Sequence, residues 1–285
     1  YMIKFSILVP TYNNLDYLKL AINSIKKNSK YDHEIILHIN DGSDGTLDYA
    51  IINKLIYTHS KTNIGLCSSI NKAATKISTK YVLYVHDDMY LCKNWDEILK
   101  KEIEILDDDL FYLSGTNYEI RDINKQYNPG NSPKKFDPEM FHQFCINKKG
   151  KDLQGSHWAP HIVSKRLWDI VGGFSEEFNP GDGSDPDFCM KLWINNVRIF
   201  KSIDEFKVFH FGSRTTRNEK IVKNNGTKKF LLKYGFNPKF FRKYYLRGGA
   251  KSVYNGPLNE PKKSLIYIFE LFINKIKIFF YRLSF

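Results

Sequence analysis

The sequence predicts an α/β fold with a mostly parallel sheet, flanking helices and a C-terminal helical extension. Apolar runs rich in β-branched residues, at 3–9, 34–40 and 81–85, alternate with segments of helical periodicity. Strands that alternate with helices favour a parallel sheet. Polar clusters follow the three runs, at 10–13, 40–44 and 86–88. Ligands of parallel sheets bind beyond the carboxyl ends of the strands, so these clusters are expected to share one ligand-binding edge.

The individual elements follow from local patterns. Pro10 is expected to stop the first strand, and Asn13 or Asn14 to cap the helix after it. The segment 118–150, rich in Asn, Pro, Lys and Gly, predicts a long loop or flap. The predicted elements in chain order are strand 3–9, helix 13–30, strand 34–40, helix 47–54, strand 55–57, helix 63–78, strand 81–85, strand 111–116, a strand and a helix within 156–174, helix 185–196 and strand 206–212.

Composition narrows the class of protein. The 285 residues carry a formal charge of +12, which favours anionic partners: nucleotide phosphates, nucleic acid or an anionic membrane surface. The four cysteines lack metal-ligand spacing and predict reduced thiols in a reducing, cytoplasmic compartment. Residues 2–4 lead directly into a strand pattern, so no secretory signal is expected. No run approaches the ~20 apolar residues of a membrane-spanning helix.

The three polar clusters together can form a nucleotide pocket. Thr11, Tyr12 and Asn13 offer hydrogen-bonding groups and a stacking face for a flat polar ring. Asp41 can accept a proton from such a ring. Asp88, with its neighbour Asp87, offers the hard oxygen ligands that Mg²⁺ and Mn²⁺ prefer when they bridge a diphosphate. Polar turn residues also end most strands, and this simpler explanation applies to each cluster taken alone.

The order of the motifs resembles the family 2 inverting glycosyltransferases of the GT-A fold. The resemblance covers residues 3–212 and rests on "SILVPTYNN", "INDGSDGT", "NIGLCSSINKA", "YVLYVHDDM" and "DIVGGFSEEF…GDGSDPDF". It implies a Rossmann-like, mostly parallel sheet and an enzyme of polysaccharide biosynthesis. Such an enzyme moves a sugar from a nucleoside-diphosphate sugar, with UDP favoured, to a hydroxyl of a glycan or lipid-linked acceptor, using Mn²⁺ or Mg²⁺.

The resemblance also implies roles for individual donor-side residues. The nucleotide-binding positions are Pro10, Thr11, Tyr12, Asn13, Asp41, Asn63 and Asn71. The family's Asp-x-Asp motif binds ribose with its first Asp and metal with its last. Here His86 occupies the first position and Asp88 the last. The histidine is a departure: it contacts ribose or metal itself, or it leaves the ribose to Asp87, or it is a solvated turn residue.

The acceptor side begins at "GSDPDF" (residues 183–188). The family has a Glu-Asp pair at this helix start, whose Asp is the general base; Ser184 replaces the Glu and Asp185 matches the base. Asp182 and Asp187 are the competing candidates, and Asp187 is also a candidate for acceptor binding. A carboxylate of ordinary pKa is ionised at pH 7 and can accept the acceptor's proton. Helix capping is the alternative role for Asp185.

Further residues complete the implied site. His210 is the counterpart of a family histidine that joins the metal site, and imidazole in the ligand set favours Mn²⁺ over Mg²⁺. Arg214 and Arg217 are candidates to neutralise the leaving diphosphate, with a solvated basic loop as the alternative. Aromatic faces stack on sugars, so Trp158 is the main acceptor-binding candidate, together with His161 and Trp193. Core packing is the expected role of both Trp168 and Trp193.

The chain is expected to divide into residues 1–212, with a nucleotide-sugar half (1–116) and an acceptor half (117–212), and a basic extension, 213–285. Residues 214–251 contain twelve Lys or Arg and one acidic residue, Glu219. Residues 262–285 predict an amphipathic helix whose polar stripe comprises Lys263, Glu270, Asn274 and Lys277. It is expected to lie on a membrane surface, which would make the protein peripheral on the cytoplasmic face. Packing on a partner subunit or on the catalytic domain is the alternative.

Two other classes of function compete with the enzyme. A nucleic-acid-binding protein would explain the basic extension, but no nucleic-acid motif accompanies it and carboxylate clusters repel phosphate; we therefore expect no nucleic-acid partner. A catalytically silent sugar-nucleotide binder would explain the departures at His86 and Ser184.

Overall fold

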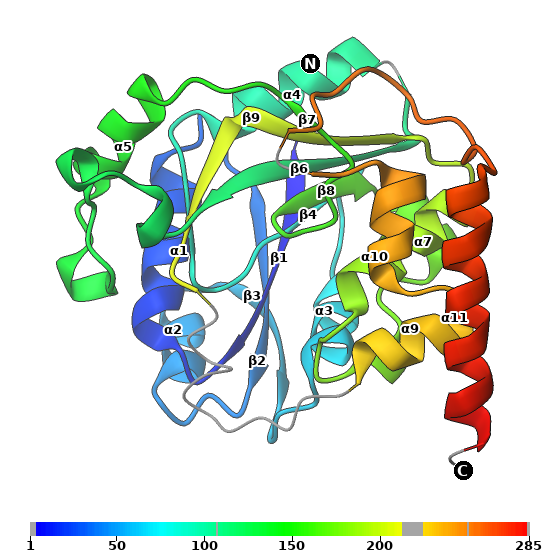
Figure 1. Cartoon of the computed structure of the whole chain (residues 1–285). Coiled ribbons are helices and arrows are strands. Elements are labelled where there is room, and N and C mark those ends of the chain that lie inside the picture. Colours follow the sequence, from blue (N-terminus) through cyan, green and yellow to red (C-terminus); the bar gives the residue numbers. More distant parts are fainter. Residues whose placement is uncertain (1–3, 107, 213–224, 250, 284–285) are drawn as a thin grey trace.

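The computed structural model describes residues 4–106, 108–212, 225–249 and 251–283 (Figure 1). Its strands are β1 (Phe5–Tyr12), β2 (Glu34–Asn40), β3 (Ile56–Ser60), β4 (Tyr81–Tyr84), β5 (Met89–Leu91), β6 (Phe111–Tyr118), β7 (Leu153–Gln154), β8 (His161–Ser164) and β9 (Ile199–His210). Its α-helices are α1 (Leu15–Lys27), α2 (Thr46–Ile52), α3 (Leu66–Ala74), α4 (Trp95–Leu106), α5 (Pro138–Asn147), α6 (Lys165–Val171), α7 (Ser184–Ile194), α9 (Gly226–Tyr234), α10 (Pro238–Phe240) and α11 (Leu265–Leu283).

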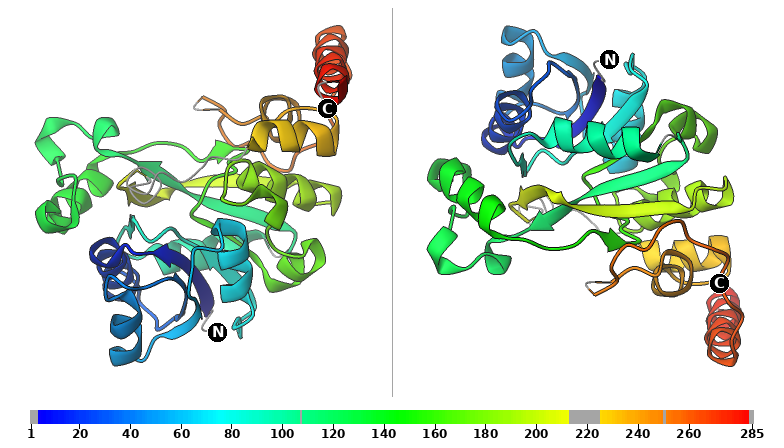
Figure 2. Two further views of the ribbon diagram at one scale, coloured as in Figure 1. Left: turned by 90° about the horizontal axis from the view of Figure 1, so that it is seen from below. Right: turned by 90° about the horizontal axis from the view of Figure 1, so that it is seen from above.

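The described strands form one mixed sheet in the order β3-β2-β1-β4-β8-β6-β9-β5, with β7 paired to β9. The first four of these run parallel, which confirms the predicted α/β class. Helices α1 and α3 lie on opposite sides of β1 (Figures 1 and 2). The core face of α1 includes Leu18, Ile22 and Ile25, which are all buried.

The carboxyl ends of β1, β2 and β4 meet at one edge, as the sequence predicts. In the parallel register Tyr12 is opposite Asn40, and Leu8 is opposite Tyr84. The expected strand stop at Pro10 is wrong, since β1 continues to Tyr12. Pro10 is tolerated there because its nitrogen faces the β4 side, where pairing ends at Leu8 and leaves no ladder bond to lose.

The second half of the sheet is mixed. β8 runs antiparallel to both β4 and β6, β5 and β7 run antiparallel to β9, and β6 runs parallel to β9. In the β5–β9 register Met89 lies opposite His210, and the backbone N–H of Phe211 donates to the carbonyl of Asp88 at 3.0 Å. This pairing places the end of β9 beside the polar turn that precedes β5.

The predicted flap at 118–150 is more ordered than expected. It contains three short 3₁₀ helices, η1 (Ile120–Asp122), η2 (Lys125–Tyr127) and η3 (Pro133–Lys135), followed by α5. The Asp137 side chain caps α5 by accepting hydrogen bonds from the N–H groups of Glu139 and Met140. Phe141 and Phe144 of α5 are buried in the hydrophobic core. These apolar positions fix a segment whose overall composition resembles a loop.

The extension after β9 packs beside α7. It contains α9, α10, the π-helix η5 (Phe241–Leu246) and α11, the last of which stands at the periphery in both views of Figure 2. Asn274 anchors α11: its Oδ1 accepts the N–H of Asn237 at 3.1 Å, and only 4% of the residue is exposed. Tyr267 packs between the rings of Phe240 and Tyr244. Within the described residues no helix is long and apolar enough to cross a membrane.

Candidate active site

A cavity of about 740 Å³ lies at the strand-end edge that the sequence predicts. This volume is within the usual range of ligand pockets, ~300–1,000 Å³. Polar side chains from β1, the turn after β4, β6, α7 and β9 face it. The predicted site residues that line it are Pro10, Thr11, Tyr12, Asn63, His86, Asp87, Asp88, Trp158, Asp185 and His210. Trp158 is 51% exposed and presents an open aromatic surface.

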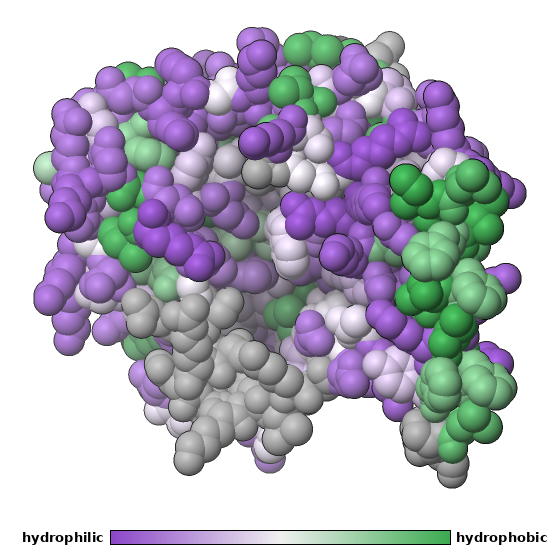
Figure 3. All heavy atoms as spheres, viewed as in Figure 1, coloured by the Kyte–Doolittle hydropathy of each residue, from purple (hydrophilic) through white to green (hydrophobic). Residues whose placement is uncertain are grey.

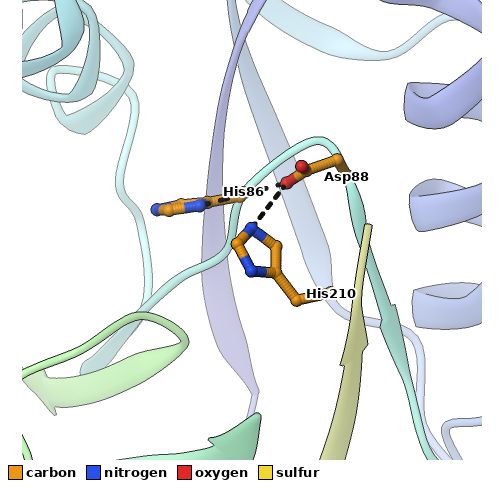
Figure 4. A group of neighbouring side chains, drawn as sticks. All are labelled: His86, Asp88 and His210. Carbon is orange, nitrogen blue, oxygen red and sulfur yellow. Dashed lines mark ion pairs between the residues drawn. The ribbon is translucent and has the colours of Figure 1, made fainter. Parts of the chain in front are cut away.

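Three of these residues form a cluster with metal-ligand chemistry (Figure 4). The ligand atoms of His86, Asp88 and His210 all lie within 4.8 Å of one another. Asp88 Oδ1 is 3.3 Å from His210 Nε2 and 4.0 Å from His86 Nδ1. One carboxylate oxygen between two imidazole nitrogens is a donor set that fits a divalent transition metal, so the residues present fit the implied ion. His86, at the first position of the motif, therefore lies beside Asp88 and His210 in this cluster.

The protonation of the cluster follows from its surroundings. Burial, reinforced by the charge of His210, lowers the pKa of His86 to about 4, so this ring is neutral at pH 7. Burial also lowers the pKa of His210, but its contact with Asp88 outweighs burial and the net shift is upward. Glu119 Oε1 lies 3.8 Å from His210 Nδ1, on the other side of the ring. A metal ion would replace a proton on His210, because imidazole binds metal in its neutral form.

Asp87 points to a different partner from Asp88. Its Oδ2 accepts a hydrogen bond from the Thr11 hydroxyl at 2.7 Å, and 8% of the residue is exposed. Burial, followed by the charge of Asp88, raises the pKa of Asp87 to about 7, although Thr11 acts in the opposite direction. The contact ties the β1 end to the turn after β4, and leaves Asp87 in the cavity wall as a nucleotide-binding candidate.

Asn13 and Asp41 form a polar bracket beside the cavity. Asn13 Nδ2 donates to Asp41 Oδ2 at 2.9 Å, and Asn13 Oδ1 accepts the N–H of Gly42 at 3.0 Å. The hydrogen bonds from Asn13 and Ser43 lower the pKa of Asp41, which therefore stays an ionised acceptor. Both backbones have positive φ, 44° at Asn13 and 59° at Asp41, a conformation that Asn and Asp adopt more readily than most residues. Neither side chain is part of the cavity wall itself.

Asp185 reaches the cavity from the first turn of α7. The residue is half-buried, and burial raises the pKa of its carboxyl to about 7. The expectation of an ordinary pKa is therefore wrong, because the carboxylate sits among protein groups instead of in open solvent. Gly183, with φ 84°, occupies the cap position, so Asp185 is inside the helix and is not its cap. A base with a pKa near the working pH is well matched to proton transfer.

The competing acids occupy other places. Asp182 lines the cavity but is exposed, and its Oδ2 accepts the N–H of Gly226 at 3.0 Å. Asp187 has no exposed surface and lies outside the cavity wall. Its Oδ1 accepts from Lys233 Nζ at 2.8 Å and from the Tyr234 hydroxyl at 2.7 Å. The expected acceptor contact of Asp187 does not agree with this position, which instead joins α7 to α9.

The positions of Asn71 and His161 correct two more expectations. Asn71 uses both ends of its amide on the backbone of Phe174, at 2.8 and 2.9 Å, and does not line the cavity. It holds α3 to the loop after α6, so a nucleotide contact does not fit its position. His161 is 1% exposed and packs among the rings of Tyr84, Tyr112, Phe174 and Phe188, and burial lowers its pKa to about 3. Trp193 and Trp168 are buried, as core packing requires.

The sequence analysis missed the cavity wall that follows β6. Asn117, Glu119, Arg121 and Asp122 line the cavity there. Arg121 forms an ion pair with Glu119 at 3.3 Å and brings a positive charge to the cavity wall. Like the other strands at this edge, β6 ends in polar residues, but the predicted strand 111–116 stops before Asn117. Arg214 and Arg217 lie outside the described residues.

Comparisons with known proteins identify the family of the chain. Residues 6–170 match the family model of glycosyl transferase family 2. The chain belongs to glycosyl transferase family 2. It is 26% identical over 231 residues to a chondroitin synthase of Pasteurella multocida (strain Pm70), and equally to a hyaluronan synthase of Pasteurella multocida. Each match covers 77% of the chain but only 22% of the relative's length.

Solved structures give the fold. The S. aureus TarS fragment 1–349 in complex with UDP matches with a TM-score of 0.53 and 20% identity over 73% of this chain and 60% of that one. The same fragment in complex with UDP-GlcNAc matches with a TM-score of 0.50. The mixed α/β architecture of this family 2 member is therefore the GT-A fold.

The buried contact at Asp187 predicts a purely structural role. Asp187→Ala should lower the free energy of unfolding by about 3 kcal/mol, because it leaves Lys233 and Tyr234 without their buried acceptor. Denaturant unfolding checks this value, with the exposed Asp16→Ala as the control, expected within about 0.5 kcal/mol of the parent. Nucleotide affinity should not change in the folded Asp187 variant; a tenfold loss would contradict the assignment.

Proposed function

We propose that this protein is an inverting glycosyltransferase that uses a nucleoside-diphosphate sugar and a divalent cation. The observation that carries the proposal is the presence in one cavity of the His86/Asp88/His210 cluster and of a carboxylate, Asp185, whose pKa is raised to about 7. The first suits a cation–diphosphate complex and the second suits a general base. Membership of family 2 supports the same reaction.

The donor would bind across the strand ends. Tyr12 offers a ring for stacking, and the Asn13–Asp41 bracket offers an ionised acceptor for the imide N–H of uracil or thymine. UDP is favoured because a related fold was solved with UDP and with UDP-GlcNAc. Asp88 and His210 would hold the cation, with His86 as a third ligand, and the imidazoles favour Mn²⁺ over Mg²⁺. When bound, the cation would neutralise the charge of the diphosphate leaving group.

The chemical step uses the acid at the start of α7. Asp185 takes the proton of the acceptor hydroxyl, and the hydroxyl oxygen forms a bond to the anomeric carbon as the bond to the diphosphate oxygen breaks. Attack from the opposite face inverts the anomeric configuration. Trp158, exposed in the cavity wall, gives the acceptor sugar a stacking surface. We propose a glycan or lipid-linked acceptor, and a cytoplasmic setting that agrees with four free cysteines.

Replacing the base tests the mechanism directly. Asp185→Asn should reduce sugar transfer by about 10²–10⁴-fold and leave nucleotide affinity nearly unchanged, because the amide keeps the shape and cannot accept the proton. The assay is release of UDP from UDP-GlcNAc and other UDP-sugars with a panel of glycan acceptors, and Asp182→Asn is the matched control. Full activity of the Asp185 variant would rule out this base. Donor binding without transfer in the parent protein would indicate a silent binder.

The pH dependence of transfer follows from the raised pKa of Asp185. The base works as the carboxylate, so kcat should fall about tenfold per pH unit below pH 7 and level off above it. Saturating donor and Mn²⁺ keep titration of the metal-side groups out of the profile. Asp182→Asn should leave the inflection in place. A flat kcat between pH 5 and 8, with chemistry rate-limiting, would contradict the assignment.

The metal dependence of UDP binding should change when a residue of the His86/Asp88/His210 cluster is replaced, and should not change when another residue of the cavity wall is replaced. Asp88→Ala should weaken Mn²⁺-dependent UDP binding more than about tenfold, whereas Asp182→Ala should not. His86→Asp replaces a nitrogen donor by a hard oxygen donor, and should therefore shift the metal preference towards Mg²⁺. Calorimetric titration of UDP with each metal measures both effects. Equal UDP affinity with and without Mn²⁺ in the parent protein would contradict the metal site.

A further inference from the structure

Helix α11 turns its apolar side chains away from the protein. Figure 3 shows them as a continuous hydrophobic band along the helix. The exposed fractions range from 53% at Ile268 to 85% at Leu265. The exposed apolar residues are Leu265, Ile266, Ile268, Phe269, Phe272, Phe279, Phe280 and Leu283. A helix that packs on its own domain normally buries this face, so the orientation of α11 is reversed.

Polar contacts hold the reversed orientation in place. Asn274, Glu270 and Tyr267 face the protein: Asn274 binds the backbone of Asn237, and Glu270 pairs with Lys243 at 2.6 Å. The Asn274 amide nitrogen donates within the helix to the carbonyl of Glu270, but its Oδ1 finds the N–H of Asn237 in this orientation, and rotation of the helix would leave that buried oxygen without this donor. The outward apolar face is therefore specified by the fold.

Cations border the apolar face on both sides. With 3.6 residues per turn, the exposed apolar positions fall on one arc of α11, with Lys275 and Arg282 next to one border and Lys277 next to the other. These three cations are exposed. Lys262 and Lys263, also exposed, stand just before the helix. Long basic side chains in these places can lie along an apolar surface and reach a charged layer above it.

We propose that this face of α11 binds an anionic membrane surface, with the helix lying in the plane of the interface. Its apolar arc would enter the acyl boundary, and its border cations would meet anionic headgroups. Two copies packed face to face would instead bring the border cations of one helix against those of the other. The charge pattern therefore favours lipid over a second copy. Surface binding of this kind needs no helix that spans the bilayer, and it is independent of the proposed reaction.

Vesicle co-sedimentation tests the apolar part of the proposal. The parent protein should pellet with phosphatidylcholine vesicles that contain about 30% phosphatidylglycerol, and at least tenfold less with pure phosphatidylcholine. The double variant Phe272→Ser/Phe279→Ser should lose at least tenfold in partitioning. Its matched control is Ile52→Ser/Ile105→Ser, which changes two side chains that are 77% and 65% exposed on α2 and α4 and should bind like the parent. Thermal melts confirm that each variant is folded.

Charge and orientation have their own readouts. Lys275→Glu/Arg282→Glu should abolish the preference for anionic vesicles, whereas Lys61→Glu/Lys101→Glu, with the same change of net charge at exposed positions, should reduce it only slightly. Brominated lipid should quench the added fluorescence of F272W and not that of I105W. Equal pelleting of parent and Phe272→Ser/Phe279→Ser would overturn the proposal. The proposal would also be overturned if the parent protein failed to bind vesicles and instead formed a dimer in sedimentation equilibrium that the Phe272→Ser/Phe279→Ser variant did not form.

Discussion

The pairing of β5 with β9 is the constraint on which the candidate site depends. The register sets Met89 opposite His210, and the carbonyl of Asp88 accepts the N–H of Phe211. Two stretches more than a hundred residues apart are thereby held with a carboxylate and an imidazole 3.3 Å apart. His86 belongs to the same turn as Asp88 and joins the cluster as a consequence. A slip of one residue in β9 would turn His210 to the other face of the sheet and dismantle the cluster.

The cavity concentrates negative charge in a protein of formal charge +12. Asp87, Asp88, Asp182 and Asp185, with Glu119, face one space, and burial raises the pKa of Asp87 and of Asp185 to about 7. Such a wall is unfavourable for a bare polyanion, because unpaired phosphates would meet carboxylates. It becomes favourable once a divalent cation accompanies the phosphates. The same charge repulsion argues against nucleic acid as the ligand of this cavity. The excess of Lys and Arg in the chain therefore lies outside the cavity.

Local patterns predicted those parts of the site that a strand end supplies. Thr11, His86 and Asp88 stand at or just after the ends of buried strands. The carboxyl ends of parallel strands meet at one edge of the sheet, so the sequence alone predicts the edge at which these residues lie. Asn71 and Asp187 could not be judged in this way. Their partners, Phe174 and Lys233, lie 103 and 46 residues further along the chain, and only tertiary packing shows that these polar groups are already satisfied. The prediction of a loop or flap at 118–150 failed for a related reason, because the buried side chains of Phe141 and Phe144 order a segment of loop-like composition.

The C-terminal extension is packed against α7, the helix that carries the proposed base. Asp187 follows the proposed base by two residues in α7, and as a fully buried carboxylate it depends on Lys233 and Tyr234 of α9 for its partners. Helix α9 in turn contacts α11, whose Asn274 is bound to the backbone just before α10. A continuous set of packed helices therefore connects the apolar face of α11 with the first turn of α7. The proposed docking of α11 on a lipid surface would fix the orientation of the helix that carries Asp185, and with it the direction from which a lipid-linked acceptor of the proposed reaction would approach the cavity.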